Sequence, residues 1–180
     1  QNVEAYSLLQ KLGNSDELTG LMNRNAYEQA LNGYEASPHS YCCIYADANG
    51  LHDLNNNYGH EAGDKMLITV ATAMKIAFGG NDIYRIGGDE FILMCYNANH
   101  EYVDQMMKDF VNFVGSQCKE ECPTVKVTVS LGYVLYPDYG SDVAELANLA
   151  DKALYKAKRH GKNMAVGYED GVDKSSDAKV

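Results

Sequence analysis

Basic residues are scarce in this sequence, and tryptophan and long apolar runs are absent. Its 180 residues include 15 Lys and Arg against 25 Asp and Glu, which gives a formal net charge of -10. This balance argues against broad binding to a nucleic-acid backbone, although it permits a local cationic pocket for one nucleotide. No apolar run approaches the ~20 residues that a membrane helix needs. We therefore expect no nucleic-acid partner and no membrane contact by this domain.

Cysteine is also sparse, and its five copies are an odd number. Cys42, Cys43 and Cys95 lie in apolar runs, where free thiols behave as small hydrophobic side chains. Cys118 and Cys122 have C-x3-C spacing without a matching Cys or His pair, which favours a structural role over a zinc site. The pattern indicates a reducing compartment. We expect a cytoplasmic location, which the cytoplasmic domain of a larger, membrane-bound receptor would also satisfy.

Apolar periodicity divides the chain into helices and strands. Helical spacing predicts helices over residues 2–12, 24–34, 61–78, 102–115 and 143–157, the last capped by Ser141 and Asp142. Alternating or continuous apolar runs predict strands over residues 40–45, 82–86, 91–96, 124–136 and 164–168. The segment 1–13 resembles the end of a connecting helix from an upstream module. The polar segment 169–180 is expected to be a disordered tail.

The order of these elements predicts the fold class. Strands 82–86 and 91–96 are joined by a glycine-rich turn, so they form a hairpin rather than part of a parallel sheet. We predict an α+β fold with a mainly antiparallel sheet flanked by helices. The order β-α-β-β-α-β between residues 41 and 167 matches a ferredoxin-like core.

Acidic residues at two turns are the first candidates for chemistry. Gly87 and Gly88 allow a tight turn and close approach of a ligand, and Asp89 and Glu90 follow them at the hairpin tip. Asp47 ends an apolar strand, so it can share a hard cation with Asp89. Taken alone, the hairpin acids fit a solvated surface turn, and Asp47 fits a helix cap.

A polar run and two lysines are the other candidates. Asn55 and Asp64 combine an amide with a carboxylate, which together can hydrogen-bond the edge of a guanine base. The same run also fits a loop of turn-forming asparagines before a capped helix. Lys158 and Lys162 lie four residues apart at the end of the last helix. They can reach a triphosphate, or simply complement the helix dipole.

Together these segments resemble the GGDEF family of diguanylate cyclases. Residues 16–24 are similar to its D-x-L-T-G-L-x-N-R motif, and 47–64 to its D-x-D/N…N…G-H…G-D block. Residues 87–91 carry its namesake signature, 127–132 are similar to its V-T-V-S-x-G strand, and 150–163 to its A-D-x-A-L-Y-x-A-K…G-R-N ending. Five motifs in order, from Asp16 to Asn163, outweigh the local alternatives. The resemblance implies that residues 14–168 form a GGDEF catalytic domain with a nucleotidyl-cyclase-like palm.

The family resemblance also implies an activity and its partners. Two GTP-loaded domains would face each other as a homodimer, and each GTP 3′-hydroxyl would attack the α-phosphate of the other. The products would be cyclic di-GMP and two pyrophosphates. The cofactor would be Mg²⁺ or Mn²⁺. An upstream sensory module would regulate the reaction in the full-length protein.

The resemblance assigns roles to individual residues. Asp47, the carbonyl of Ala48, and Asp89 would hold metal, with Asp89 as the base and Glu90 in support. Asn55 and Asp64 would bind guanine. The phosphates would contact the remaining predicted substrate-binding residues: Gly50, Leu51, His52, Gly87, Gly88, Lys158 and Lys162.

Three residues and one motif depart from the family pattern. Asn49 stands where many members have a second Asp, His52 replaces a Lys, and Lys162 replaces an Arg. The family's inhibitory R-x-x-D motif would fall at residues 78–81, where neither charged residue is present. The alternative function is therefore a catalytically weak domain that binds GTP or cyclic di-GMP as a regulatory module.

Overall fold

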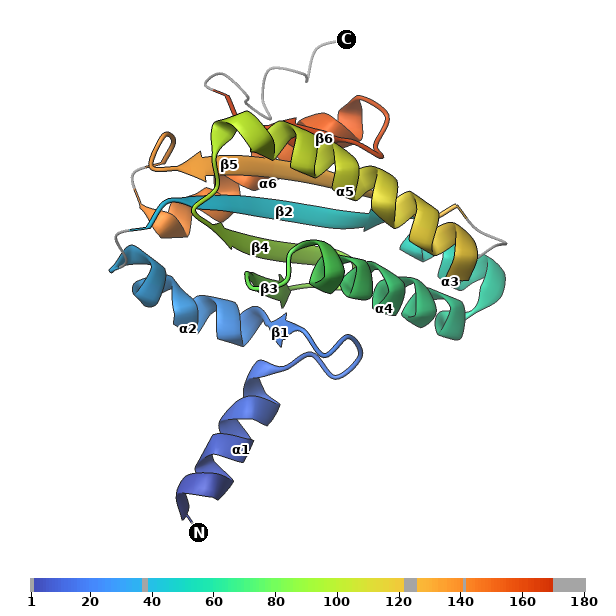
Figure 1. Cartoon of the computed structure of the whole chain (residues 1–180). Helices are drawn as coiled ribbons and strands as arrows, with labels where there is room; N and C mark the ends of the chain where they lie inside the picture. The colour runs from blue at the N-terminus through green and yellow to red at the C-terminus, as the bar shows by residue number, and fades with distance from the viewer. Residues whose placement is uncertain (1, 37–38, 122–125, 141, 170–180) are drawn as a thin grey trace.

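A computed structural model of the chain describes residues 2–36, 39–121, 126–140 and 142–169 (Figure 1). In chain order its elements are α1 (Asn2–Asn14), β1 (Met22–Asn23), α2 (Arg24–Glu35), β2 (Tyr41–Asn49), α3 (Leu51–Tyr58), α4 (His60–Ala77), β3 (Asp82–Arg85), β4 (Glu90–Tyr96), α5 (His100–Glu121), β5 (Thr128–Tyr136), α6 (Val143–Arg159) and β6 (Ala165–Gly167). Cys122, the cap at Ser141 and the tail from residue 170 lie outside the described residues.

The strands form one six-stranded sheet in the order β1-β3-β4-β2-β5-β6. β2 pairs antiparallel with β4 and β5, and β3 pairs antiparallel with β4. Only the outer pairs β1–β3 and β5–β6 are parallel. The α+β class and the mainly antiparallel sheet are thus confirmed. β2, β3, β4 and β5, with the intervening helices, give the β-α-β-β-α-β order of the ferredoxin-like core.

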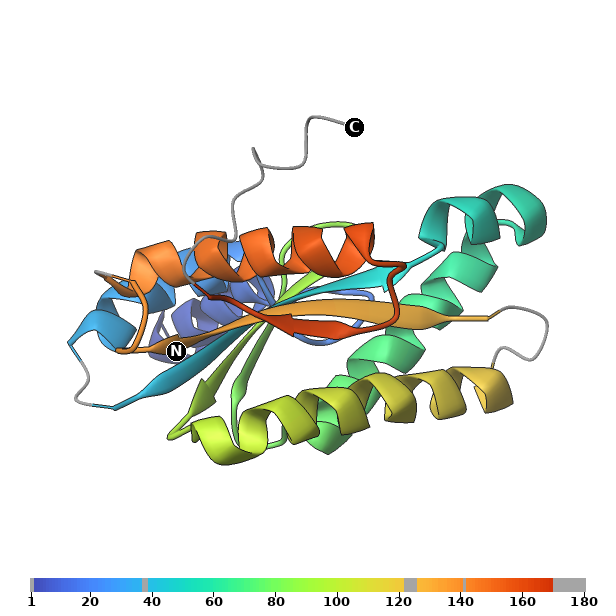
Figure 2. The same ribbon diagram turned by 90° about the horizontal axis from the view of Figure 1, so that it is seen from above.

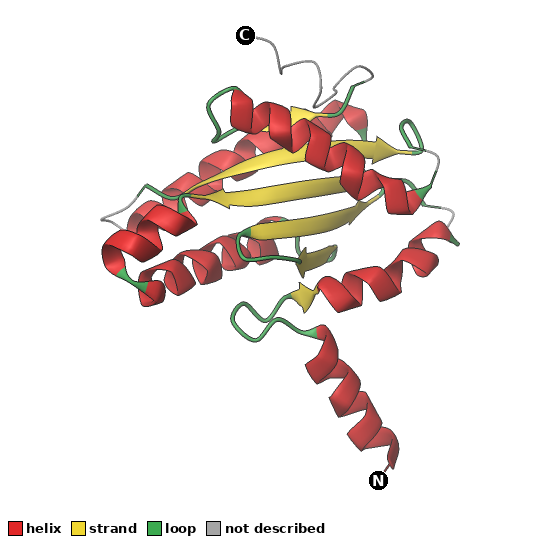
Figure 3. Cartoon of the chain, turned by 180° about the vertical axis from the view of Figure 1, so that it is seen from behind, coloured by secondary structure: helices red, strands yellow, loops and turns green. Residues whose placement is uncertain are grey.

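The helices cover both faces of the sheet (Figures 2 and 3). Even-numbered β2 residues such as Ile44 and Ala46 pack in the core beneath α4 and α5. Odd-numbered residues such as Tyr41 and Cys43 pack beneath α2 and α6. Alternate strand residues point to opposite faces, so a doubly covered strand must be apolar on both. Asp47 shares the parity of Tyr41 and therefore points toward α6.

Gly132 explains the glycine of the V-T-V-S-x-G segment. A Cβ at this position would lie 2.0 Å from the backbone oxygen of Ala150 and 2.2 Å from the backbone nitrogen of Leu154. Both contacts are with the backbone of α6, which a side chain cannot displace without moving the helix. The missing side chain lets α6 lie close against β5, and this packing sets the distance from α6 to the end of β2.

Several elements differ from the sequence expectation. Residues 51–58 form a helix, α3, where the sequence predicted no helix and left a loop of turn-forming asparagines open; buried Leu54 anchors it. β2 continues four residues past the predicted end at Tyr45, because β4 pairs with it as far as Asp47 and β5 as far as Asn49. α5 is longer than predicted and β5 begins at Thr128. The short edge strand β1 was not predicted.

α1 projects away from the sheet, and the N-terminus lies at its far end (Figure 1). Its described side chains include exposed Val3, Leu8 and Leu9. Its assignment to a connecting helix stays a prediction. None of the helices within the described ranges has the length and apolar character needed to cross a membrane.

Candidate functional site

The end of β2 and the tip of the β3–β4 hairpin bring the predicted acidic residues together. Asp47 pairs in register with Glu90 on β4. The Ala48 amide donates a 2.9 Å hydrogen bond to the carbonyl oxygen of Asp89. Glu90 folds back over Gly87, where a Cβ would lie 2.7 Å from Glu90 Oε2. The backbone therefore holds the strand end and the hairpin acids at one edge of the sheet.

Asp47 is a buried carboxylate with an unusual environment. Burial raises the pKa of Asp47, the hydrogen bond from Lys158 opposes that rise, and the neighbouring Asp89 carboxylate adds to it. Lys158, on α6, contacts Asp47 Oδ2 directly. The lysine expected at the phosphates thus lies on a candidate metal ligand. A buried acid beside a second acid favours a cation at this place.

The donor set fits a hard divalent metal. The Asp47 and Asp89 carboxylates and the Ala48 carbonyl supply only oxygen, the donor atom that Mg²⁺ prefers. Over the described ranges, no group of three or more His, Cys, Asp and Glu side chains could hold an ion. Mg²⁺ commonly takes one or two carboxylates and completes its shell with water and substrate phosphates. These residues fit a metal that binds together with a nucleotide.

Asn49, which stands where many members of the family have a second Asp, faces the neighbouring strand β5. Its Nδ2 donates hydrogen bonds of 3.0 Å to Thr128 Oγ1 and 3.0 Å to Ser130 Oγ on β5. The backbone amide of Asn163 also donates to Ser130 Oγ, at 3.2 Å. The amide of Asn49 therefore fastens the end of β2 to β5 and to the turn after α6, and it adds no charge.

The N-terminus of α3 offers backbone donors beside the carboxylates. Gly50, the residue before α3, has φ 91°, a left-handed conformation that favours glycine. It has no side chain that could cap the helix. The first helical bond runs from Leu54 N to Gly50 O at 3.0 Å. The amides of Leu51, His52 and Asp53 precede that bond, and such unpaired helix-start amides are suited to phosphate.

The candidate guanine-binding residues lie on the two helices that follow β2. Asn55 Oδ1 is buried and has no hydrogen-bond partner. A Cβ at Gly63 would lie 1.9 Å from this oxygen, so the glycine lets the Asn55 amide rest against α4, one residue before Asp64. The structure thus brings the Asn55 side chain against Gly63, the residue before Asp64 on α4. An orphaned buried oxygen next to an exposed acid leaves polar groups for a ligand.

Two other predicted residues lie in exposed positions. His52 is held along α3, with its Nε2 3.0 Å from Asn56 Nδ2. Lys162 lies in the turn after α6 with φ 62°, and its amide donates to Ala157 O at 3.0 Å. Neither side chain lies on the carboxylates, so any phosphate contact by them needs the bound ligand.

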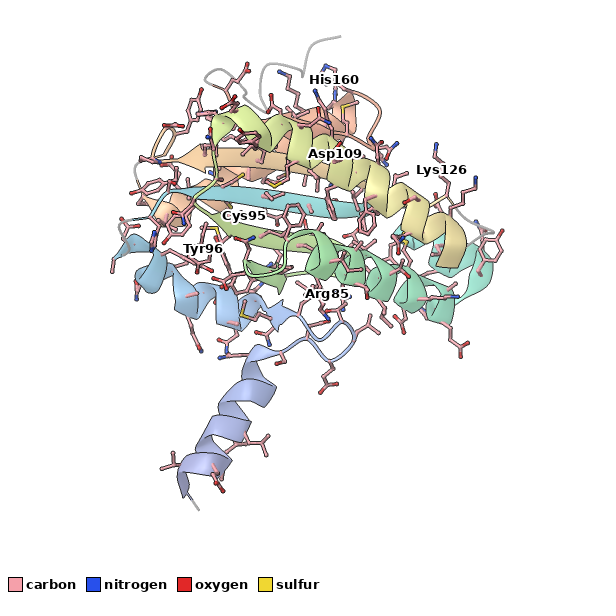
Figure 4. The ribbon with its side chains drawn as sticks, in the orientation of Figure 1. Arg85, Cys95, Tyr96, Asp109, Lys126 and His160 are labelled. Carbon is pink, nitrogen blue, oxygen red and sulfur yellow. The ribbon has the colours of Figure 1, made fainter. Side chains whose placement is uncertain are left out.

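Arg85 is a functional candidate that the sequence reasoning missed. Its NH1 lies 3.1 Å from both carboxylate oxygens of Asp16, while NH2 donates to the Gly88 carbonyl at 2.8 Å. Figure 4 shows Arg85 beside the loop that joins α1 to β1. Arg24 Nε adds a 3.1 Å bond to Ile86 O. Arg85 thus joins the D-x-L-T-G-L-x-N-R segment, through Asp16, to the hairpin. The one sequence feature that could have indicated this role is an arginine two residues before Gly87.

Comparisons with known proteins bear on this geometry. A family model described as "Diguanylate cyclase, GGDEF domain" matches residues 13–164. The chain is 34% identical over 165 residues to the cyclic di-GMP phosphodiesterase PdeB of Shewanella oneidensis, covering 90% of this chain and 19% of PdeB. It is 28% identical over 169 residues to the probable diguanylate cyclase DgcT of Escherichia coli, covering 90% of this chain and 37% of DgcT.

Solved structures show the same fold. The coiled coil and GGDEF domain of DgcB from Caulobacter crescentus, in complex with c-di-GMP, matches with a TM-score of 0.81. That match covers 91% of this chain and 90% of the DgcB chain at 24% identity, so it speaks for the fold alone. Because this family model matches residues 13–164, which is most of the chain, the chain belongs to the GGDEF domain family.

Proposed function

We propose that this domain is a diguanylate cyclase. It would condense two GTP molecules into cyclic di-GMP and release two pyrophosphates. The observation that carries the proposal is the meeting of Asp47 and Asp89 at the end of β2, beside the uncapped start of α3. Acids with oxygen-rich surroundings next to a phosphate-binding helix start suit phosphoryl chemistry. Purified chain incubated with GTP and Mg²⁺ or Mn²⁺ tests it.

The chain's own residues divide the work. Asp47, the Ala48 carbonyl and Asp89 would hold Mg²⁺ or Mn²⁺, which when bound would neutralise phosphate charge and make the ribose 3′-hydroxyl more acidic. Asp89 would accept the proton of that hydroxyl as its oxygen attacks the α-phosphate. The α-phosphate's bond to the pyrophosphate breaks in the same step. Glu90 would keep the hairpin tip in shape through its contact with Gly87.

The substrate would lie across the end of the sheet. The amides that follow Gly50, from Leu51 and His52, would hold phosphate oxygens, and Gly87 and Gly88 would let the nucleotide approach the hairpin. Lys158 would exchange its contact with Asp47 for the phosphates, and Lys162 would join it from the turn after α6. Each chain supplies one such half-site, so turnover needs a homodimer.

Guanine selectivity should follow from Asn55 and Asp64. Asp64 accepts from the guanine N1-H and amine, whereas adenine presents an unprotonated N1. We expect ATP to compete poorly with GTP, and Asn55→Ala to raise the KM for GTP about tenfold, since one lost hydrogen bond costs roughly 1 kcal/mol or more. Steady-state kinetics with both nucleotides measures this. Asn57→Ala, an exposed change on the same helix, is the control. Equal consumption of ATP and GTP would refute the assignment.

Product inhibition should occur only by competition with GTP. The two residues at the charged positions of the family's inhibitory motif stabilise the fold here. Phe78 is buried, and its ring centroid lies 4.8 Å from that of Phe110. Asn81 Oδ1 accepts a 2.9 Å hydrogen bond from the Tyr96 amide. Neither side chain carries a charge with which to bind cyclic di-GMP at a second, inhibitory site. Initial rates at several product concentrations should give a raised KM and an unchanged kcat. A fall in kcat at low product concentration would show an inhibitory site elsewhere.

A second candidate is a regulatory module that binds GTP or cyclic di-GMP without turnover. Asn49 supplies no second carboxylate, and Lys158 lies on Asp47. The chain spans 19% of PdeB and 37% of DgcT, so it corresponds to one part of these longer proteins. An upstream sensory module would then set either the rate or the binding. Nucleotide binding with no new product would select this second function.

A further inference from the structure

A pocket lies at the other end of the sheet from the carboxylates. Its cavity of about 360 Å³ is lined by Ala30, Gly33, Tyr34, Tyr41, Asp82 and Tyr96. Tyr41 begins β2 and Asp47 nearly ends it, so the two sites are about 20 Å apart at a rise of about 3.3 Å per residue. The pocket is therefore separate from the proposed cyclase site and shares no lining residue with it.

Three tyrosine rings form one wall of this pocket. The ring centroids of Tyr34 and Tyr96 each lie 5.4 Å from that of Tyr41, and 6.4 Å from each other. The rings are inclined to one another by between 56° and 71°. Figure 4 shows Tyr96 at the end of the sheet beside α2, and it is 38% exposed. Aromatic faces around a small cavity are typical of sites for organic cations.

Asp82 supplies a negative charge to the same pocket. Its Oδ2 accepts from the Tyr34 hydroxyl at 2.5 Å and from the Tyr96 hydroxyl at 2.6 Å. The Tyr34 hydroxyl is also 2.6 Å from that of Tyr84. Burial and the hydrogen bond to Asp82 raise the pKa of Tyr34, so its hydroxyl remains a donor. In the described part of the chain, no Lys, Arg or His forms an ion pair with Asp82.

Tyr41 adds an unmet polar group. Its side chain is fully buried, and its hydroxyl has no hydrogen-bond partner. An orphaned buried hydroxyl costs free energy that a bound polar group would recover. The ring of Tyr96 is the exposed part of the wall, so its displacement is the simplest way to open a path to the Tyr41 hydroxyl.

We propose that this pocket binds a small organic cation with N–H donors, of the protonated alkylamine class. The ammonium would donate to Oδ1 of Asp82 and, once Tyr96 moves, to the Tyr41 hydroxyl. Its alkyl part would pack on the tyrosine rings and over Gly33. Ligands with an acidic group are disfavoured by the Asp82 carboxylate. The proposal goes beyond the cyclase reaction and does not depend on it.

Calorimetric titration with butylammonium chloride at neutral pH tests this site. We expect saturable binding of one cation per chain, with no measurable binding of butan-1-ol, which has the same length and no charge. Asp82→Asn should weaken the affinity at least tenfold, whereas Asp109→Asn, an exposed acid on α5, should leave it unchanged. Tyr41→Phe should weaken binding without lowering the unfolding temperature, because it removes a group without a partner.

A pocket-filling variant keeps the test independent of the polar residues. A Cβ at Gly33 meets nothing within 4 Å, so Gly33→Leu should fold and occlude the cavity. Loss of butylammonium binding in Gly33→Leu supports the assignment. Absence of saturable binding by the unaltered chain, or full affinity in Gly33→Leu, would overturn it. Equal affinity for tetramethylammonium would contradict the N–H donor. Since no readout involves GTP, failure here leaves the proposed cyclase function untouched.

Discussion

Replacing Asp89 by asparagine should lower the rate of cyclic di-GMP synthesis by about a thousandfold or more, or about 4 kcal/mol in the activation free energy. Asparagine keeps the size of the side chain but removes its negative charge and its ability to accept the hydroxyl proton. The fold should survive, because the hydrogen bond from the Ala48 amide to residue 89 uses its backbone carbonyl. Product formation from GTP, followed by chromatography, measures the loss.

The control for this variant is Asp109→Asn, which makes the same chemical change on the exposed side of α5 and alters only a pair with Gln105. It should keep the wild-type rate. Both variants should unfold within a few degrees of the unaltered chain. A rate for Asp89→Asn near that of the control would remove Asp89 from the catalytic role and leave the hairpin acids without one.

Dilution should reduce the specific activity of the chain, by up to about a hundredfold for a hundredfold dilution below the dimer dissociation constant. In the proposed mechanism each chain would supply one half-site, whereas the reaction would join two GTP molecules head to tail. The charge of -10 on each chain opposes their encounter at low salt. α1 has 13 residues, a length at which an isolated helix is marginal, so it adds little to association.

Fusion of a dimeric coiled coil before α1 provides the matching gain. It should restore the specific activity at the low concentrations where the unfused chain is inactive, because the second chain is then held nearby. Sedimentation at each concentration gives the monomer fraction. Constant specific activity in a chain shown to be monomeric would exclude the proposed pair of half-sites.

The sequence predicted the elements whose signal is local. The hairpin was evident because two apolar strands flank Gly87 and Gly88, and the amphipathic helices showed their stripes. α3 was missed because Asn55, Asn56 and Asn57 favour turns; its stability comes from Leu54 and from packing on α4. The predicted strand ended at Tyr45 because the polar residues that follow do not look like a strand in the sequence. In the structure, pairing with β4 and β5 continues the strand through them.

The site shows the same division between local and distant information. Asp47 and Asp89, which the motifs assign to one metal, lie together at one edge of the sheet, beside a helix start that the sequence did not predict. The contact of Lys158 with Asp47 joins residues 111 positions apart, and the Arg85–Asp16 pair joins residues 69 apart. Such pairings depend on how α6 and the entry loop pack on the sheet. No spacing rule in the sequence carries that information.

The most direct test of the central claim is the product of GTP turnover. The purified chain at high concentration is incubated with GTP and Mg²⁺ or Mn²⁺, and the nucleotides are resolved by chromatography and identified by mass. The proposed function predicts cyclic di-GMP with two pyrophosphates for each product molecule. GTP that remains intact, or that yields only GDP and phosphate, would contradict it.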